Sequence, residues 1–389
     1  MPGPLNGCRV IELAGLGPAP FAAMTLADMG AEVIRIERPG GSGFFPGLEH
    51  LDILNRGKKS VALDLKDAGA VEAVLEMVTK VDILLEGYRP GVAERLGLGP
   101  EHCLSRNPRL VYGRMTGWGQ TGPLSHSAGH DIGYIALTGA LHAIGPGDGP
   151  PQIPLNLVGD FGGGANYLVM GVLAALRHAD QSGEGQVVDA AIVDGAAHLL
   201  ASTHMMMATD AWSDERGCNM LDGGWPFYAV YECSDGKHVA VGALEPQFYA
   251  ELLRLLDLDI DPKNQHDRNQ WGALRRTLVE TFKQRTRDDW ATFFEGSDAC
   301  VAPVLSLREA ANHPHMASRG TVVDRDGVLQ AAPAPRFSST VSEIGSSPPI
   351  PGQHTVEVLH QWGLSHVLKP CTETPDRPLI RGPESGSGS

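Results

Sequence analysis

The sequence predicts an α/β fold, in which a large domain built on a parallel sheet is joined to a smaller α+β domain. Through the first half of the chain, short β-branched runs alternate with helical patterns, which is the order of βαβ units. After Gly223-Gly224 two apolar runs are joined by Ser-Asp-Gly-Lys, which is typical of a β-hairpin. With 389 residues the chain is long enough for two domains.

The large domain is expected to span residues 1–205 and to be completed by the C-terminal segment 330–375. Apolar runs predict strands at 8–14, 33–37, 60–65, 81–86, 110–115 and 186–189. Helical patterns between them lie at 21–30, from 66 to 80, after Pro90, and at 161–180 and 191–209. Strands that alternate with helices in this way indicate a Rossmann-like sheet.

The small α+β domain is expected at 225–320. It begins with the hairpin, 227–233 and 238–242, and continues with helices near 246–256, 271–283 and 287–295. A Pro- and Ser-rich stretch, 332–353, then leads to a last short helix at 355–362. Residues 376–389, rich in Gly and Ser, are predicted to be a flexible tail.

Composition excludes several classes of protein. The net charge of −15 argues against a nucleic-acid partner, which needs a broad basic surface. No uninterrupted apolar stretch reaches the ~18 residues that span a bilayer, so no membrane span is expected. The six cysteines are scattered, without the spacing of a metal or redox site. With no secretion signal and no C-terminal peroxisomal tripeptide, we expect a cytoplasmic-type soluble compartment.

The first strand is followed by Gly15-Leu-Gly17-Pro-Ala-Pro20, which resembles a dinucleotide-binding turn. That turn needs a third glycine for close helix–strand packing and backbone amides directed at the pyrophosphate. Pro20 replaces the glycine, and Pro18 has no N–H to donate. A sheet of this class is therefore expected without nicotinamide binding.

Basic residues gather at the expected strand ends and loops of the large domain, where ligands of open α/β sheets bind. Such a cluster can hold the phosphates of an anionic ligand, and arginine suits bidentate phosphate contact. Each of these side chains taken singly is better explained as a solvated surface charge, whereas the set as a whole favours ligand binding. The cluster comprises Arg35, Arg38, Arg56, Lys58, Lys59, Lys66, Arg89 and Arg95.

Two further positions combine a titratable side chain with an expected helix start. His130 and Asp131 precede an amphipathic run, so the backbone amide of Asp131 could stabilise an oxyanion and His130 could carry a proton. Asp160 is followed by three glycines, which weaken a helix and suggest a close approach to the backbone. Asp160 is then a candidate base or nucleophile. The pattern alone favours a simpler role for His130 or Asp131, as a cap of the helix, and Asp160 could be a plain N-cap.

Glu245 ends an expected strand just before Pro246, where a carboxylate can cap the next helix or orient an imidazole. Met205-Met-Met207 and Met220 suggest an adaptable apolar surface for varied acyl chains, although core packing is the commoner explanation of such methionines.

From about Gly3 to Gln361 the sequence resembles the racemase branch of the type III CoA-transferase (CaiB/BaiF) superfamily. The resemblance depends on long motifs in the same order. They include Glu86-Gly-Tyr-Arg-Pro90, Met115-Thr-Gly-Trp-Gly-Gln-Thr-Gly122, Gly129-His-Asp-Ile132, Leu155-Asn-Leu-Val-Gly-Asp-Phe-Gly-Gly-Gly164, Asn219-Met-Leu-Asp-Gly-Gly224 and Asp298-Ala-Cys-Val301.

This resemblance implies an interlocked homodimer with active sites shared between the large domain of one subunit and the small domain of its partner. His130 and Asp160 would be the two acid/base groups, and Glu245 of the partner chain would pair with His130. Coenzyme A would enter as part of the substrate, and no separate cofactor is implied. Its implied contacts are Arg38, Leu63, Asp64, Leu65, Lys66, Gly87, Tyr88, Arg89, Arg95, Gly129, Ile132, Gly133 and Tyr134.

The implied reaction is racemisation of 2-methylacyl-CoA thioesters by 1,1-proton transfer through an enolate, with one base on each face of the α-carbon. Gly133 stands where the racemases usually carry Asn, and Trp225 where they carry a small residue. With Met220, Trp225 is expected to reshape the acyl pocket. The alternatives are a CoA-transferase that uses Asp160 as nucleophile and a non-catalytic acyl-CoA-binding protein.

Overall fold

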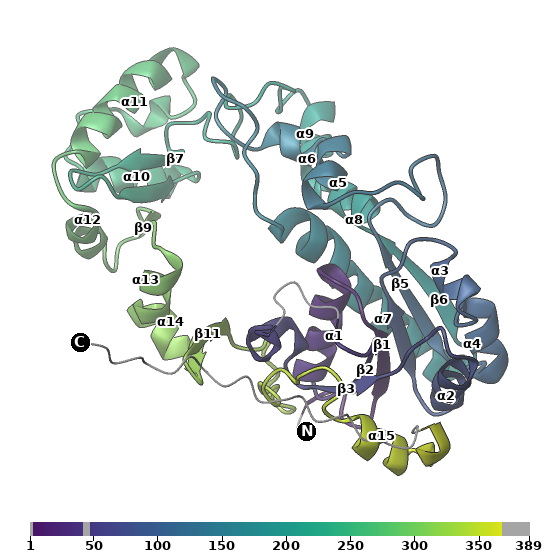
Figure 1. The fold of residues 1–389 in the computed structure, drawn as a ribbon. Helices are drawn as coiled ribbons and strands as arrows, with labels where there is room; N and C mark the ends of the chain where they lie inside the picture. Colours follow the sequence, from purple (N-terminus) through teal and green to yellow (C-terminus); the bar gives the residue numbers. More distant parts are fainter. Residues whose placement is uncertain (1–2, 42–46, 368–389) are drawn as a thin grey trace, which may run out of the picture.

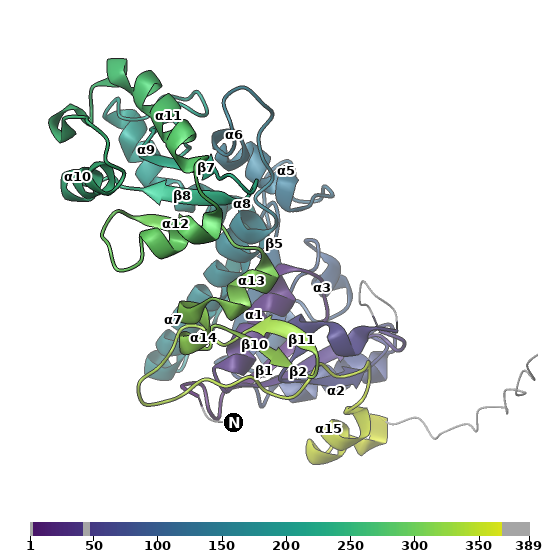
Figure 2. The same ribbon diagram turned by 90° about the vertical axis from the view of Figure 1, so that its left-hand side faces the viewer.

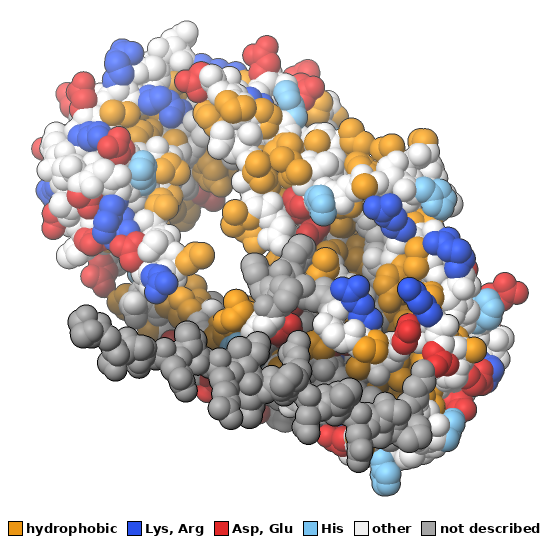
Figure 3. Space-filling model, in the orientation of Figure 1, with side chains coloured by type: hydrophobic (Ala, Val, Ile, Leu, Met, Phe, Trp, Pro, Cys, Tyr) orange, Lys and Arg blue, Asp and Glu red, His pale blue; other side chains and the backbone are white. Residues whose placement is uncertain are grey.

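The computed structural model describes residues 3–41 and 47–367, so the expected tail at 376–389 lies outside the described residues. The chain forms a large domain and a small domain at opposite ends of an elongated molecule (Figure 1). A space-filling view shows an opening between them (Figure 3). The two domains therefore leave much of their facing surfaces apart within one chain.

The large domain is built on a six-stranded sheet whose strands are all parallel, in the order β3-β2-β1-β4-β5-β6. The strands are β1 (Arg9–Leu13), β2 (Glu32–Glu37), β3 (Lys58–Ala62), β4 (Ile83–Glu86), β5 (Val111–Thr116) and β6 (Gln186–Ala191). This is the Rossmann strand order, which places ligands beyond the carboxyl ends of the strands. The predicted parallel α/β sheet is confirmed.

Helices cover both faces of this sheet, and successive strand residues feed two separate cores. On one face lie α1 (Pro18–Asp28) and α7 (Asn166–Ser182). On the other lie α2 (Ala68–Val78), α4 (Pro100–Arg106) and the C-terminal α15 (Thr355–Gln361). Ile11 and Ile34, for example, point to the second core, whereas Val10 and Val33 point to the first.

The large domain also contains short helices in the segments that follow β4, β5 and β6. They are α3 (Val92–Arg95), α5 (Asp131–Leu137), α6 (Ala140–Ala143), α8 (Ile192–Leu199) and α9 (Ala201–Ala208). The single helix expected at 191–209 was wrong, because the chain breaks at Leu200 into α8 and α9. Among the described residues, the helical segment Leu157–Ser182 is long and apolar enough to meet the criteria of a membrane span. Core helices of other proteins meet the same criteria, and the α7 part of this segment packs on β5 and β6.

The small domain has an antiparallel sheet of β7 (Tyr228–Glu232), β8 (His238–Gly242) and β9 (Val301–Pro303). The expected hairpin is formed by β7 and β8, and β9 is an added strand. The helices α10 (Pro246–Leu255), α11 (Arg268–Phe282) and α12 (Arg287–Phe293) complete an aromatic-rich core.

The chain then returns to the large domain through α13 (Leu307–Asn312), α14 (Pro314–Arg319) and the hairpin of β10 (Val322–Arg325) and β11 (Val328–Ala331). Figure 2 shows this hairpin in front of the large sheet. It is held there by Arg56, which pairs with Asp28 and donates to the Ala331 carbonyl. The small domain is thus an insertion between two parts of the large domain.

A buried ionic cluster lies between β1–β3 and α1. The Lys58 ammonium is 2.7 Å from the Glu12 carboxylate and also donates to the Pro20 carbonyl. Arg35 pairs with the same carboxylate. Glu12 and Lys58 are 0% and 1% exposed, and burial lowers the pKa of Lys58 to about 8. Removing one partner would therefore leave charges buried without compensation.

We expect Glu12→Gln to lower the free energy of unfolding by about 3–5 kcal/mol, because Lys58 and Arg35 would lose their shared carboxylate. The matched control is Glu72→Gln, which breaks an exposed pair with Arg106 and should cost under ~1 kcal/mol. Urea denaturation followed by circular dichroism measures both. Equal, small changes would contradict a structural role for the cluster.

Candidate active site

His130 lies directly before α5, at the N-cap position, with extended backbone angles. Its side chain makes no capping hydrogen bond, and it is exposed. The imidazole is therefore not used to complete the helix. The next residue, Asp131, is the first of α5, so its backbone N–H belongs to the group that a helix leaves without a partner.

Asp160 lies in a π-helical turn, Leu157–Ala165, that runs directly into α7. The interpretation of Asp160 as an N-cap was wrong, because the helix begins earlier, with Asn156 at the cap position. A π-helix carries one extra residue per hydrogen-bonded turn, and such segments are frequent at functional sites. Here the turn directs the Asp160 side chain toward Gly17, where a Cβ atom would lie 3.3 Å from Oδ2.

The three glycines after Asp160 allow the neighbouring helix α8 to pack closely against the backbone. The interpretation from sequence, that a ligand approaches the backbone at these glycines, was therefore wrong. A Cβ atom at Gly163 would lie 2.6 Å from the Ala196 backbone nitrogen of α8. In return, a Cβ atom at Gly195 would lie 1.8 Å from the Gly163 carbonyl oxygen. The π-helical turn and α8 therefore touch backbone to backbone, and this contact sets the depth of the Asp160 turn.

His130 and Asp160 line one cavity of about 300 Å³ at the carboxyl ends of the strands. Its walls come from the start of α1, the loop after β4, the loop after β5 and the start of α5. Four of the implied coenzyme A contacts are here as well: Gly87, Tyr88, Arg89 and Gly129. A fifth, Tyr134, packs its ring edge-on against Trp118, 4.7 Å between centroids.

Burial raises the pKa of the Asp160 carboxyl to about 6. Within this raised pKa, the neighbouring Asp131 carboxylate is the second cause after burial, and the charge of His130 acts in the opposite direction. A carboxyl group with this pKa holds or releases a proton near neutral pH, as a general acid/base must. The cavity therefore brings the His130 imidazole together with a carboxyl group whose pKa is raised toward neutrality.

Glu245 lies at the N-cap of α10 in the small domain, where it makes no capping hydrogen bond and is exposed. It does not line the cavity that contains His130 of the same chain. The Glu245 charge acts instead on the thiol of Cys300. The pKa of that thiol is raised first by burial and next by Glu245. One chain alone therefore does not bring together all of the expected acid/base groups.

The basic cluster expected from the sequence divides into two groups. Four members are structural, which corrects that expectation: Arg35 and Lys58 pair with Glu12, Arg56 with Asp28, and Lys59 with Glu32 and Glu357. The other four, Arg38, Lys66, Arg89 and Arg95, are exposed and form no ion pair with another described residue. Figure 3 shows Lys and Arg side chains on the large domain around α3, which carries Arg95.

The remaining expected contacts lie outside the cavity. Leu63 and Asp64 line a separate depression near α15, with Leu65 and Lys66 beside it in sequence. Ile132 is exposed, and a side chain at Gly133 would meet open space. In the small-domain segment, Met220 is half-buried, and Trp225 packs against Trp271 and Phe227.

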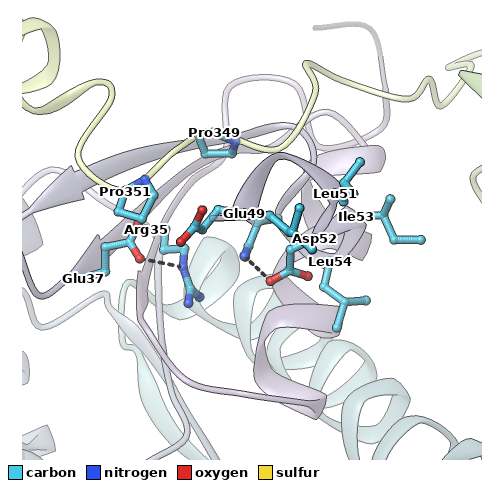
Figure 4. Close-up of a pocket in the computed structure, with 11 residues that line it drawn as sticks. Arg35, Glu37, Glu49, Leu51, Asp52, Ile53, Leu54, Pro349 and Pro351 are labelled. Carbon is cyan, nitrogen blue, oxygen red and sulfur yellow. Dashed lines mark hydrogen bonds and ion pairs between the residues drawn. The ribbon is translucent and has the colours of Figure 1, made fainter. Parts of the chain in front are cut away.

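A larger cavity, of about 470 Å³, lies beneath the connection from β2 to β3. Figure 4 shows Arg35 and Glu37 at its base and Pro349 and Pro351 above them. These charged side chains belong to the buried cluster that includes Glu12. We place the candidate site in the smaller cavity, because it contains His130 together with Asp160, whose carboxyl pKa is raised to about 6.

Sequence reasoning missed several residues of the site. Trp118 lines the cavity, and its buried Nε1–H has no hydrogen-bond partner among the described residues. Ser125 and Ser127 line it too, and their loop carries no helical or strand pattern that would indicate a site. In the described part of the chain, no group of His, Cys, Asp or Glu side chains is arranged to hold a metal ion.

Comparison with known proteins relates the chain to enzymes of coenzyme A thioesters. The α-methylacyl-CoA racemase of Mus musculus is 43% identical over 93% of this chain and 94% of its own length. The succinyl-CoA:glutarate CoA-transferase of Homo sapiens is 30% identical over 92% of this chain and 86% of its own. A CaiB/BaiF family protein from Brucella suis has a similar structure, with a TM-score of 0.80, 26% identity and coverage of 93% and 100%.

The sequence model of CoA-transferase family III matches residues 5–355, which is most of the chain. This match includes both parts of the large domain and the whole small domain. The chain belongs to CoA-transferase family III.

Proposed function

We propose that this protein is a racemase of 2-methylacyl-CoA thioesters, in which one of His130 and Asp160 removes the α-proton and the other delivers a proton to the opposite face of the α-carbon. The observation that supports this most directly is the cavity that holds an imidazole together with a carboxyl group whose pKa is raised to about 6. The 43% identity to a racemase over nearly the whole chain favours the same reaction. In this proposal Asp160 and His130 face opposite sides of the α-carbon.

The chemistry follows from the weak acidity of a thioester α-proton. One group removes the proton as a base while the other holds a proton for the opposite face. Negative charge then develops on the thioester oxygen, and the backbone N–H of Asp131 is proposed to stabilise it. No electrons are transferred, so the side chains and the amide are sufficient for this proton transfer.

We further propose that two copies of the chain share each active site, with Glu245 of the second copy beside His130. Two observations support this. Glu245 is exposed and lies outside the cavity of its own chain. Large apolar side chains near the cavity are also left exposed in the single chain, which is typical of surfaces that a partner covers. They include Leu137, Ile153, Leu155, Leu157, Leu199 and Met205.

The four exposed cations without ion pairs are proposed to hold the phosphates of coenzyme A, with Arg89 at the cavity wall and Arg38, Lys66 and Arg95 farther out. The acyl chain would then lie toward the small domain, near Met220 and Trp225 of a partner chain. A CoA-transferase that uses Asp160 as nucleophile remains the second candidate, since a relative at 30% identity is one. That reaction would not require a proton-carrying His130.

We expect the protein to incorporate deuterium at the α-carbon of a 2-methylacyl-CoA in deuterated water, starting from either epimer. His130→Ala and Asp160→Ala should each reduce epimerisation by about 10²–10⁴-fold, because each removes the base for one face. Mass spectrometry and chiral analysis measure these quantities. Transfer of CoA to a free acid without deuterium uptake would replace the racemase with the transferase.

A heterodimer of one His130→Ala chain and one Glu245→Gln chain should retain one intact shared site and so about half of the parent activity. Two affinity tags on co-expressed chains isolate this heterodimer. The matching homodimers serve as controls and should be nearly inactive. If each chain supplied its own Glu245, the heterodimer would be as inactive as the homodimers.

Arg89→Ala and Arg95→Ala should each raise KM for the acyl-CoA about 10-fold or more, with a smaller effect on kcat. The physical reason is that a charge-assisted hydrogen bond contributes about 1.5–3 kcal/mol. Arg106→Ala is the control, since Arg106 is exposed but already paired with Glu72. Steady-state kinetics at fixed ionic strength tests this, and an unchanged KM in both variants would remove these arginines from the substrate site.

A further inference from the structure

We propose that Asp131 is a positioning residue, whose side chain ties the π-helical turn that carries Asp160 to the start of α5, the helix that follows His130. The inference rests on the proposed racemase function, in which these two groups must stay at a fixed separation across one carbon. It adds a role for the Asp131 side chain to that of the backbone amide.

The contact that carries the proposal joins segments 29 residues apart in the chain. Asp131 Oδ2 accepts a hydrogen bond from the backbone N–H of Asp160 at 2.6 Å. A charged acceptor makes such a bond shorter and stronger than a neutral one. Because Asp131 is covalently next to His130, this one bond sets the distance between the backbones that carry the two acid/base side chains.

The surrounding residues are shaped for this carboxylate. A Cβ atom at Gly159 would lie 2.3 Å from Asp131 Oδ2, so only glycine permits the bond to form. The second oxygen, Oδ1, is buried and has no hydrogen-bond partner among the described residues. A neutral side chain such as asparagine could accept the same hydrogen bond from Asp160 without leaving a charged oxygen unpaired. A buried polar atom without a partner calls for an explanation, and we look for it in the function of the site.

The charge itself acts on Asp160. From α5, the groups that face Asp160 are His130, Asp131 and Tyr134. The loop after β4 brings Arg89 to the same cavity, and α8, which packs on the π-helical turn, carries Asp194 and His198. Of these, the Asp131 carboxylate is the one that raises the pKa of Asp160, in addition to burial.

This electrostatic effect suits a reversible proton exchange between a carboxyl group and an imidazole. An ordinary carboxyl group is far more acidic than an imidazole, which titrates between pH 5 and 8. Raising the pKa of Asp160 brings the two proton affinities closer together. The equilibrium between epimers fixes the ratio of their kcat/KM values, so a mismatch would lower both values by the same factor.

The test compares Asp131→Asn, Asp131→Ala and the control Asp194→Asn. Asparagine can still accept the Asp160 N–H bond but carries no charge. We expect Asp131→Asn to lower the pKa of Asp160, move the acid limb of the pH–rate profile to lower pH and reduce kcat/KM of both epimers equally, by about 3–10-fold. For Asp131→Ala, which also loses the hydrogen bond from the Asp160 N–H, kcat/KM should fall by about 10²-fold. KM should change little in either variant.

Carboxyl ¹³C NMR of the protein without substrate measures the Asp160 titration, and deuterium exchange from each epimer measures turnover. Asp194→Asn should leave the Asp160 titration in place. The inference fails if both Asp131 variants titrate like the parent, or if asparagine and alanine cause the same loss with no shift in the pH profile. The proposed function fails separately, if the parent protein exchanges no α-hydrogen, because the NMR titration requires no turnover.

Discussion

The contact between the π-helical turn and α8 is the constraint on which the site depends. Gly163 and Gly195 let two backbones meet at a distance that no side chain would permit. The turn therefore lies backbone to backbone against α8, and Asp160, three residues before Gly163, is half-buried. Burial is the largest cause of the raised pKa of Asp160, so the packing of the turn that carries this residue contributes to the chemistry of its carboxyl group.

The sheet could be predicted from sequence because its central strands are buried on both faces and are rich in apolar residues, as in β4 (Ile83–Glu86), whose four residues are all buried. The hairpin of β7 and β8 was equally clear, since its turn residues are distinctive. Local pattern failed where tertiary contacts decide. The strand β9 has only three residues, Val301–Pro303, and forms by pairing with β8. The break at Leu200 lies between Leu199 and Ala201, where no Gly or Pro marks the end of a helix.

The candidate site was predictable in part. His130 and Asp160 were selected because each combines a titratable side chain with a helix start, and the structure places them in one cavity. The cause assigned to the glycines was wrong, since a sequence does not show whether a helix or a ligand approaches a backbone. Similarly, Arg35 and Lys58 could not be told from Arg89, because burial and partners separate them, and both arise from residues distant in sequence.

The division of groups between the domains explains why a single chain is an incomplete catalyst under the proposed function. The large domain holds the carbon-flanking pair on elements fixed to a rigid sheet. The small domain carries Glu245 just after β8, at the N-cap position of α10. Its side chain is exposed and makes no capping hydrogen bond. Leu155, which precedes the π-helical turn, is 69% exposed. Exposing such an apolar side chain to water is unfavourable in free energy. A second copy that covers this apolar surface would supply the missing carboxylate and exclude water from the enolate, so assembly and catalysis would depend on the same contact.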